Sequence, residues 1–400
     1  MKVFQTNLQS RLNSISKLIA SVCISLIVSC VTSKDADPPF TISASLFDQT
    51  NKVNLGLSSA EGTETHSIFK PAEETDKFTN GVVITGFKDN LYCQWQSSAR
   101  DEDSQDTWVA YSHSKDGITW NSPMELAASI VDGYCSSGGW WVAGDTLIAY
   151  VNVWPSSLSQ RGGFTYCKSS TDGISWSELK PVLMANGDTL NGILEQDPHA
   201  LPDGRIIGAA HFQPGLRVSP IYTDDKSGIR GWTRAKFPNS KVSNGYSREM
   251  EPSWFLRDDN TLVMIFRDQN NSFKCLASIS SDRGENWSRA VLTSMPDSRS
   301  KQSAGNLPDG IAFMVNNPTN NKNRYPLVIT LSKDGKLFDV AYSLREGDSD
   351  LQQLRYEGRF KRTGYHYPKA IIWKEYLVVS YATNKEDAEV TLVPLTSLVY

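Results

Sequence analysis

The stretch SKDGITW at residues 114–120 reveals the fold, because close copies of it return along the chain at a nearly constant interval. STDGISW at residues 170–176 is the second copy, and SSDRGENW at residues 280–287 is the fourth. A looser third copy occupies residues 223–232, and SKDG at residues 332–335 begins a fifth. Four copies end in a tryptophan, and these tryptophans stand 55 or 56 residues apart: Trp120, Trp176, Trp232 and Trp287. A repeat of this length indicates an array of similar structural units.

Each copy has the composition of a tight turn, in which Ser and Asp side chains cap backbone amides and Gly supplies a positive φ. A second signal keeps the same interval, because an Asp, Asn or Gly turn precedes a short apolar strand at residues 89–95, 145–151, 203–212 and 259–267. Strands bounded by such turns are typical of antiparallel hairpins. A four-stranded sheet cannot bury both faces alone, so neighbouring sheets must stack. The sequence therefore predicts an all-β, six-bladed β-propeller over residues 46–400.

The N-terminal segment has the pattern of an export signal. Basic residues precede an apolar run at residues 18–28, which is too short to span a bilayer. The run leads into Ile-Val-Ser-Cys, which resembles a bacterial lipobox ending at Cys30. We expect a lipoprotein signal peptide at residues 1–30, a polar tether at residues 31–45, and export to the bacterial cell envelope. Membrane attachment would come only through the lipid on Cys30; an ordinary secretory signal is the alternative.

The composition of the chain argues against several classes of partner and cofactor. The net charge is −4 and no basic run is present, which argues against a nucleic-acid partner. Five scattered histidines show no metal-ligand spacing, and no glycine-rich phosphate loop opens a helix, so we expect no required metal and no nucleotide cofactor. Three of the four cysteines beyond the signal lie in apolar or aromatic strand-like runs, where we expect a buried free thiol. Export permits a disulfide, but the sequence assigns none among the four: Cys93, Cys135, Cys167 and Cys275.

The repeated turn resembles the Asp-box of the sialidase superfamily, and the resemblance covers nearly all of the chain beyond the signal and tether. It implies a propeller of the sialidase type, whose site lies at one end of the central channel. Asp-boxes are structural in that family and lie away from the site, so they indicate the fold rather than the activity. Site residues must come from segments between the boxes.

The segment that begins at Arg248 resembles the part of a sialidase where a glutamate precedes a strand ending in a carboxylate-binding arginine. Glu251 matches that glutamate, with Glu249 as the competitor, and Arg267 ends an apolar strand 16 positions after Glu251. Arg248 itself is a further candidate for substrate binding. Sialidases have another arginine after an Asn-Pro and a polar loop, and Arg324 matches it.

Two more segments resemble catalytic parts of the family. The family has a tyrosine nucleophile before its last inner strand, where Tyr367 fits best and Tyr365 second. It has an acid/base aspartate in the loop before the first Asp-box, where Asp101 and Asp103 are the candidates and Asp106 is a weaker one.

One position departs from the family pattern. Sialidases open with Arg-Ile-Pro, and the corresponding stretch SIFKP at residues 67–71 has Lys70 in place of the arginine. Lysine lacks the planar fork that binds a carboxylate through two hydrogen bonds, although it still supplies a positive charge. Sialic acid itself is therefore in doubt, while an acidic sugar remains a reasonable substrate.

The resemblance implies a retaining exo-glycosidase that releases a terminal acidic sugar. Glu251 would activate Tyr367 for attack, and an aspartate of the 101–103 loop would protonate the leaving oxygen. The substrate anion would be held by three cations: Arg267, Arg324 and Lys70.

Two other functions stay open at this point, because a fold does not define an activity. A polysaccharide lyase acting on uronates would need a base, for which His199 and His211 are candidates, and its products would absorb in the ultraviolet. A non-catalytic glycan-binding protein would need no acid, base or nucleophile. The position of Tyr367 beyond hydrogen-bond reach of every glutamate would favour the binding protein.

Overall fold

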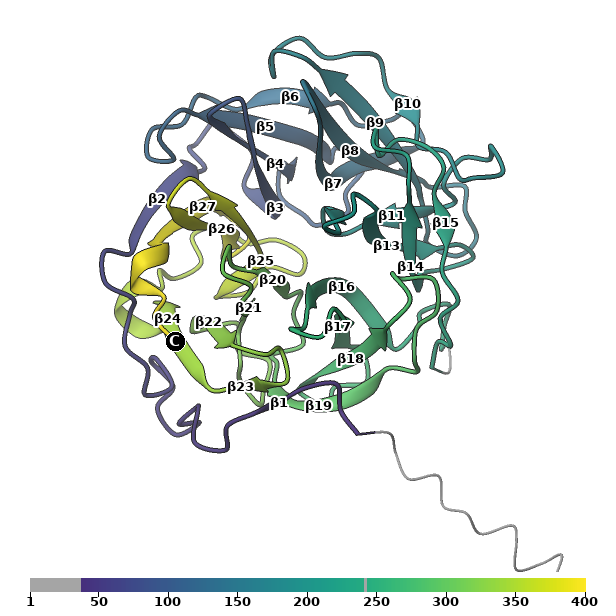
Figure 1. The fold of residues 1–400 in the computed structure, drawn as a ribbon. Helices are drawn as coiled ribbons and strands as arrows, with labels where there is room; N and C mark the ends of the chain where they lie inside the picture. The colour runs from purple at the N-terminus through teal and green to yellow at the C-terminus, as the bar shows by residue number, and fades with distance from the viewer. Residues whose placement is uncertain (1–36, 241–242) are drawn as a thin grey trace, which may run out of the picture. The chain divides into compact units, whose positions relative to one another are not determined.

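Six sheets surround a central axis in the computed structural model, which describes residues 37–240 and 243–400. Residues 38–400 form one compact unit (Figure 1). The prediction of an all-β, six-bladed propeller is confirmed. Within the described residues two short 3-10 helices accompany the strands, η1 (Asp348–Asp350) and η2 (Leu395–Ser397). No helix in the described part of the chain is long and apolar enough to cross a membrane. The expected signal peptide and Cys30 lie outside the described residues.

The first three sheets follow the chain in order, each with its inner strand first. Blade 1 contains β3 (Phe78–Phe87), β4 (Asn90–Ser98), β5 (Trp108–Ser114) and β6 (Met124–Ala127). Blade 2 contains β7 (Gly133–Ala143), β8 (Thr146–Pro155), β9 (Phe164–Ser170) and β10 (Lys180–Pro181). Blade 3 contains β11 (Gly192–Leu194), β12 (His199–Ala200), β13 (Ile206–Phe212), β14 (Arg217–Thr223) and β15 (Thr233–Arg234).

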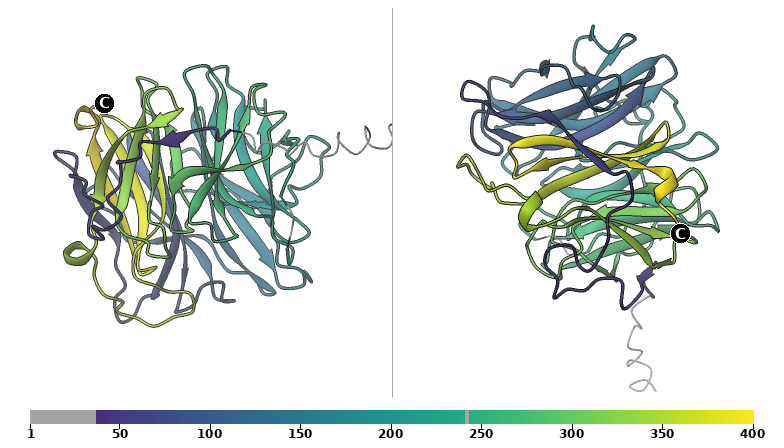
Figure 2. Two further views of the ribbon diagram at one scale, coloured as in Figure 1. Left: turned by 90° about the horizontal axis from the view of Figure 1, so that it is seen from below. Right: turned by 90° about the vertical axis from the view of Figure 1, so that its left-hand side faces the viewer.

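The remaining sheets close the ring. Blade 4 contains β16 (Glu249–Leu256), β17 (Leu262–Asp268), β18 (Lys274–Ser280) and β19 (Val291–Pro296). Blade 5 contains β20 (Ser303–Asn306), β21 (Ala312–Asn316), β22 (Leu327–Ser332) and β24 (Val340–Arg345). Blade 6 contains β25 (Tyr365–Trp373), β26 (Tyr376–Thr383), β27 (Asp387–Pro394) and, as its outer strand, β2 (Glu64–Phe69) from the other end of the unit. Figure 2 shows this pairing of purple with yellow strands, which joins the two ends of the propeller.

The expected tether overlaps the folded unit. β1 (Thr41–Ile42) pairs in parallel with β23 (Leu337–Phe338). Next to it, Phe40 is buried against Phe255 and Phe338 with edge-on ring contacts. Burial of one Phe side chain contributes about 2 kcal/mol, so this segment helps to hold blades 4 and 5.

The Asp-box turns have the hydrogen bonds that their sequence predicts. In the first copy, Ser114 Oγ accepts the Gly117 amide at 2.8 Å, and Asp116 Oδ1 accepts the next two amides at 2.8 Å each. Gly117 has a backbone φ of +76°, a value that residues other than glycine rarely adopt. The indole of Trp120 donates back to the Gly117 carbonyl at 3.1 Å. Each copy therefore closes one hairpin at the rim of its blade.

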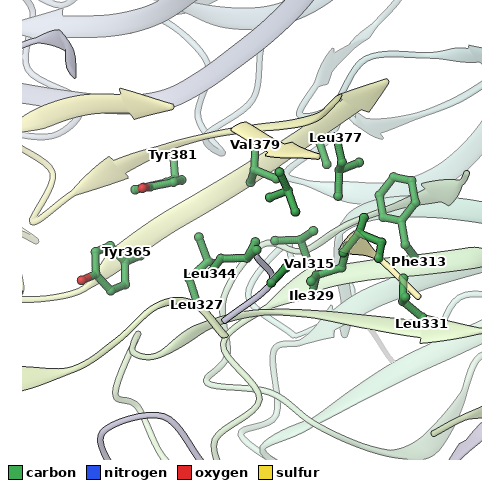
Figure 3. Packing of buried hydrophobic residues seen from close by; sticks show 14 of the residues in the cluster. Phe313, Val315, Leu327, Ile329, Leu331, Leu344, Tyr365, Leu377, Val379 and Tyr381 are labelled. Carbon is green, nitrogen blue, oxygen red and sulfur yellow. The ribbon is translucent and has the colours of Figure 1, made fainter. Parts of the chain in front are cut away.

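Apolar side chains fill the space between adjacent blades. Figure 3 shows the layer between blades 5 and 6, where Val315 and Ile329 face Val379 across the gap. Tyr365 and Tyr381 extend this layer and make an edge-on ring contact. The four cysteines of the described chain are buried free thiols in such layers: Cys93, Cys135, Cys167 and Cys275.

Candidate active site

Most inner strands are interrupted at a comparable point by a β-bulge. The pairing register shifts after Asn80 in β3, after Ser137 in β7, after Met250 in β16 and after His366 in β25. In blade 3 the inner edge is divided between β11 and β12, which leaves a gap at residues 195–198. Bulges re-aim side chains and are common beside active sites.

Unusual backbone angles mark the bulges of blades 1, 4 and 6. Gly81, Glu251 and Tyr367 have φ values of +58°, +50° and +57°. For residues with a Cβ this conformation costs on the order of 1–3 kcal/mol and persists only where surrounding structure imposes it. Both Glu251 and Tyr367 line the central cavity, so the strained backbone occurs where these side chains are placed at the site.

One cavity of about 340 Å³ collects a residue from each of the six inner edges. These residues recur with the blades along the chain and belong to five residue types, with glutamate occurring twice: Gly81, Ser137, Glu195, Glu251, Lys301 and Tyr367. Among the described residues, six cationic side chains and four carboxylates line this cavity. The excess of positive charge suits an anionic ligand.

Glu251 and Arg267 form a buried ion pair. Nη1 of Arg267 donates to both carboxylate oxygens of Glu251, at 3.1 and 3.0 Å. Burial raises the pKa of Glu251, but the nearby cations, Arg267 first among them, outweigh burial and hold that pKa below its ordinary value. Glu251 is therefore ionised, and it neutralises much of the charge on Arg267.

Lys301 and Glu195 form a second pair in the same cavity. Nζ of Lys301 donates to the Glu195 carboxylate at 2.8 Å and to its backbone carbonyl at 2.7 Å. Burial lowers the pKa of Lys301, while the charges of Glu195 and Glu251 raise it, and the net direction is upward. Lys301 stays positive, but Glu195 compensates its charge.

Arg324 has a different environment. Its side chain is 2% exposed, and Nη1 donates to His366 Nδ1 at 2.7 Å. Its Nε is buried without a hydrogen-bond partner, as is the Nε of Arg267. Within the described residues no carboxylate pairs with Arg324 or with Arg362, another cation of the cavity wall. These two arginines are therefore the uncompensated charges of the cavity.

Tyr367 lies among three cations. The guanidinium of Arg324 lies 4.7 Å from the centre of the Tyr367 ring, and the ammonium groups of Lys301 and Lys385 lie 5.2 and 5.5 Å from it. Across the described ranges, no hydrogen bond joins the Tyr367 hydroxyl to a glutamate. Cations therefore surround the Tyr367 ring, and its hydroxyl has no carboxylate acceptor among the described residues.

Asp103 lines the cavity from the loop between β4 and β5. Arg161 pairs with its carboxylate at 2.8 Å, and the Tyr134 hydroxyl donates to the same oxygen at 3.0 Å. The guanidinium of Arg161 also covers the ring of Trp154, 4.7 Å from its centre. Burial raises the pKa of Asp103, and the charge of Arg161 offsets part of that rise.

The other aromatic and acidic candidates lie away from the cavity wall. Asp101 accepts the Arg359 amide at 2.7 Å, and Asp106 accepts the Ala99 amide at 2.9 Å, so both fix loop backbones. Tyr365 belongs to the layer of Figure 3, where its hydroxyl donates to the Glu346 carbonyl at 2.8 Å.

The remaining charged candidates are also occupied elsewhere. Arg248 forms two hydrogen bonds of 2.8 Å with Asp268, and Glu249 is buried and accepts the Ser240 amide at 3.1 Å. Lys70 follows the outer strand of blade 6 and lines a separate cavity of about 470 Å³. Five of the residues predicted from the sequence therefore line one cavity: Asp103, Glu251, Arg267, Arg324 and Tyr367. Four others do not line it: Lys70, Arg248, Asp101 and Tyr365.

The histidines proposed for a lyase also lie outside this cavity. His211 is buried, and its Nε2 accepts the Glu251 amide at 3.1 Å. His199 lines a different cavity, of about 630 Å³, and its Nε2 lies 3.0 Å from Lys369 Nζ. No cluster of potential metal ligands occurs within the described residues.

Sequence reasoning missed several residues of the wall: Glu195, Lys301, Arg161, Arg362 and Lys385. Glu195 could have been found, because it stands one repeat interval of 56 residues before Glu251. Lys301 comes only 50 residues after Glu251, so the interval does not lead to it. Arg161, Arg362 and Lys385 belong to loops, where the repeat carries no information.

Comparison with known proteins identifies the class that this fold and cavity define. Residues 89–379 match the BNR repeat-like domain, and the chain belongs to that family. A comparison with curated protein sequences finds no match.

Solved structures with the same fold include several sialidases. One protein named sialidase superposes with a TM-score of 0.63 at 18% identity, over 89% of this chain and 35% of its own length. A Hadza microbial sialidase superposes with a TM-score of 0.66 at 14% sequence identity, and the match covers 84% of this chain and 69% of that one. A Trypanosoma rangeli sialidase in complex with sialic acid superposes with a TM-score of 0.58 at 14% sequence identity. That match covers 86% of this chain and 60% of the other. At these identities the likeness establishes a sialidase-type propeller fold.

Proposed function

We propose that this protein is a retaining exo-glycosidase that releases a terminal acidic sugar from a glycan, with Tyr367 as nucleophile. The observation that carries the proposal is the position of Tyr367 on a bulged inner strand, against a buried arginine that pairs with no carboxylate of the described chain. Asp103 and Glu251 complete the set of acid, base and nucleophile in the same cavity. The sialidase-type fold of the structural neighbours supports a glycosidase.

The substrate carboxylate would bind at the Arg324 side of the cavity. Arg267 and Lys301 already have carboxylate partners, so their charge attracts an incoming anion less. Arg324 and Arg362 have no such partner among the described residues, and a guanidinium offers the planar fork that suits a carboxylate. The departure at Lys70 would then matter little, because that side chain lies at another cavity.

A tyrosine suits a substrate that carries a carboxylate beside the reacting carbon. A neutral phenol approaches that centre without the repulsion that a carboxylate nucleophile would meet. The three cations around Tyr367 would stabilise the negative charge that develops on its oxygen during attack. Glu251 is the base in this proposal. It would exchange Arg267 for the Tyr367 hydroxyl when the substrate anion reaches the arginines.

Asp103 would supply the acid. Its raised pKa favours the protonated form that donates to the leaving oxygen, and the resulting carboxylate would then activate water against the glycosyl-tyrosine bond. Retention of configuration follows from the two displacements at the same carbon.

A glycan-binding protein without catalysis is the second candidate, and a specific observation favours it. The Tyr367 hydroxyl has no glutamate partner in the described chain, and Asp103 and Glu251 are both held by arginines. Such a site would bind an acidic sugar through Arg324 and release it unchanged.

Incubation with a panel of acidic glycans tests the proposal against both alternatives. The mature protein should release a monosaccharide without new ultraviolet absorbance, and Tyr367→Phe should abolish the release. New absorbance would indicate a lyase instead. Binding without any product would establish the glycan-binding protein.

Attachment to the cell envelope through a lipid on Cys30 is part of the same proposal, and it rests on the sequence of the signal. The protein expressed in a bacterium should fractionate with membranes, and Cys30→Ser should move it to the soluble fraction. Unchanged fractionation of the variant would contradict the lipid anchor.

A further inference from the structure

Arg324 is held by a neutral acceptor, whereas the neighbouring arginine is held by a carboxylate. Nη1 of Arg324 donates to His366 Nδ1 at 2.7 Å, and Nη2 donates to the Arg299 carbonyl at 3.5 Å. Arg267, in the same cavity, donates to the ionised carboxylate of Glu251. Two arginines of one site therefore carry different effective charges.

The tautomer of His366 follows from its two contacts. A guanidinium remains protonated and only donates, so Nδ1 of His366 must accept from Arg324. Nε2 then carries the hydrogen and donates to the Arg362 carbonyl at 2.9 Å. His366 thus joins the two uncompensated arginines, one through its side chain and the other through its backbone.

The surroundings keep this imidazole uncharged. His366 is fully buried, and the charges that act on it most strongly are cations: Arg324, Lys385 and Arg362. Burial and the charge of Arg324 hold the pKa of His366 well below its ordinary value. An ionised acceptor at this position would compensate Arg324 as Glu251 compensates Arg267.

We propose that His366 is a positioning residue that holds Arg324 through a neutral acceptor, so that the guanidinium keeps its whole charge for the substrate carboxylate. The inference rests on the proposed function, since it assigns the role of Arg324 within that site. The inference requires that the charge of residue 366 affects binding of the substrate carboxylate, in addition to any effect of its size and its hydrogen bond.

Two substitutions separate charge from structure. In His366→Asn the amide oxygen can accept from Arg324 without charge, and in His366→Asp a carboxylate of the same size accepts with a negative charge. His199→Asn and His199→Asp are the controls, because His199 is also a partly enclosed histidine but lines another cavity. The probes are sialic acid and D-glucuronic acid, each with its methyl ester, which lacks the anion.

Dissociation constants by calorimetry and melting temperatures are measured on the mature protein and all four variants. We expect His366→Asn to bind the acid within about threefold of wild type, and His366→Asp to bind it about ten to a hundredfold more weakly. The methyl esters should bind wild type and His366→Asp alike. The melting temperature of His366→Asp should be no lower than that of His366→Asn, because the new carboxylate pairs with Arg324.

The outcomes are distinguishable from failure of the proposed function. If wild type neither binds nor cleaves any acidic sugar, the proposed function fails together with this inference. If wild type binds the acid but His366→Asp binds it equally well, the inference alone is overturned. It is also overturned if His366→Asn and His366→Asp weaken acid and ester binding in parallel, because His366 would then be merely structural.

Discussion

Asp-box turns at the rim and bulges at the centre each recur in several blades, yet they use the repeat in opposite ways. The turns at residues 114–120 and 170–176 keep nearly the same letters and the same hydrogen bonds. The six cavity residues of the inner edges belong to five residue types, with glutamate occurring twice. A turn does the same task wherever it occurs, whereas the inner positions contribute different kinds of group to one shared site. Repetition therefore marks structure here, and departure from it marks function.

Two neighbouring tyrosines should differ most in their effect on activity. Tyr367→Phe should lower kcat on an acidic glycan by about a thousandfold or more, because the attacking oxygen is lost, with little change in stability. Tyr365→Phe is the matched control, since it loses one buried hydrogen bond in a blade layer. It should keep its activity and lose about 1 kcal/mol in urea unfolding. Equal activity losses in the two variants would refute the assignment.

A second comparison sets a central ion pair against a rim ion pair. Glu251→Gln leaves Arg267 buried without its counter-charge, so the free energy of unfolding should fall by about 3–5 kcal/mol. Glu285→Gln breaks the pair with Arg205, in which the Glu285 side chain is about half exposed, and should cost less than about 1 kcal/mol. Urea unfolding of both variants measures the difference, and costs of similar size would contradict the burial argument.

The rim turns themselves offer a comparison of two glycines in equivalent places. A Cβ on Gly173 would lie 2.1 Å from the Tyr92 hydroxyl, whereas one on Gly117 would meet Leu91 at 3.2 Å. Both have φ near +75°. Gly173→Ala should therefore cost about 3 kcal/mol and Gly117→Ala about 1 kcal/mol by thermal unfolding, with glycan cleavage unchanged in the folded protein. Loss of specific activity in either folded variant would place the turns in the site.

A shift in pH dependence should be the smallest of these effects. The charge of Arg161 lowers the pKa of Asp103, so Arg161→Gln should raise it further. An acid that must be protonated then stays active to higher pH, and the alkaline limb of kcat/KM should move up by about one unit. Arg230→Gln, which removes a pair with Asp225 at the rim, should leave the profile in place. A downward shift for Arg161→Gln would exclude Asp103 as the acid.

The repeated turns made the fold predictable from the sequence, because each copy contains the residues that form its own hydrogen bonds. The site was predictable only in part. Glu251, Arg267 and Tyr367 lie on or beside strands and could be matched by short segments. Lys70 was expected to help hold the substrate anion, but the structure places it after the outer strand of blade 6, at another cavity.

The reason for this difference is topological. β2 joins blade 6 from the far end of the chain, so the first strand of the repeat region is an outer strand and β3 is the first inner one. No local pattern in the sequence predicts that β2 pairs with β27 in blade 6. Arg161 and Arg362 were beyond prediction for a related reason, since loops reach the cavity by tertiary packing alone.

Covalent trapping at Tyr367 is the sharpest test of the proposed nucleophile. The mature protein would be incubated with a fluorinated sialic acid that slows breakdown of a glycosyl-enzyme, and the intact and digested protein examined by mass spectrometry. We predict a mass increase of one acidic sugar residue, located on the peptide that contains Tyr367 and absent in Tyr367→Phe. Release of sialic acid from a glycan by the same protein, with no adduct or with an adduct on another residue, would contradict the proposed mechanism.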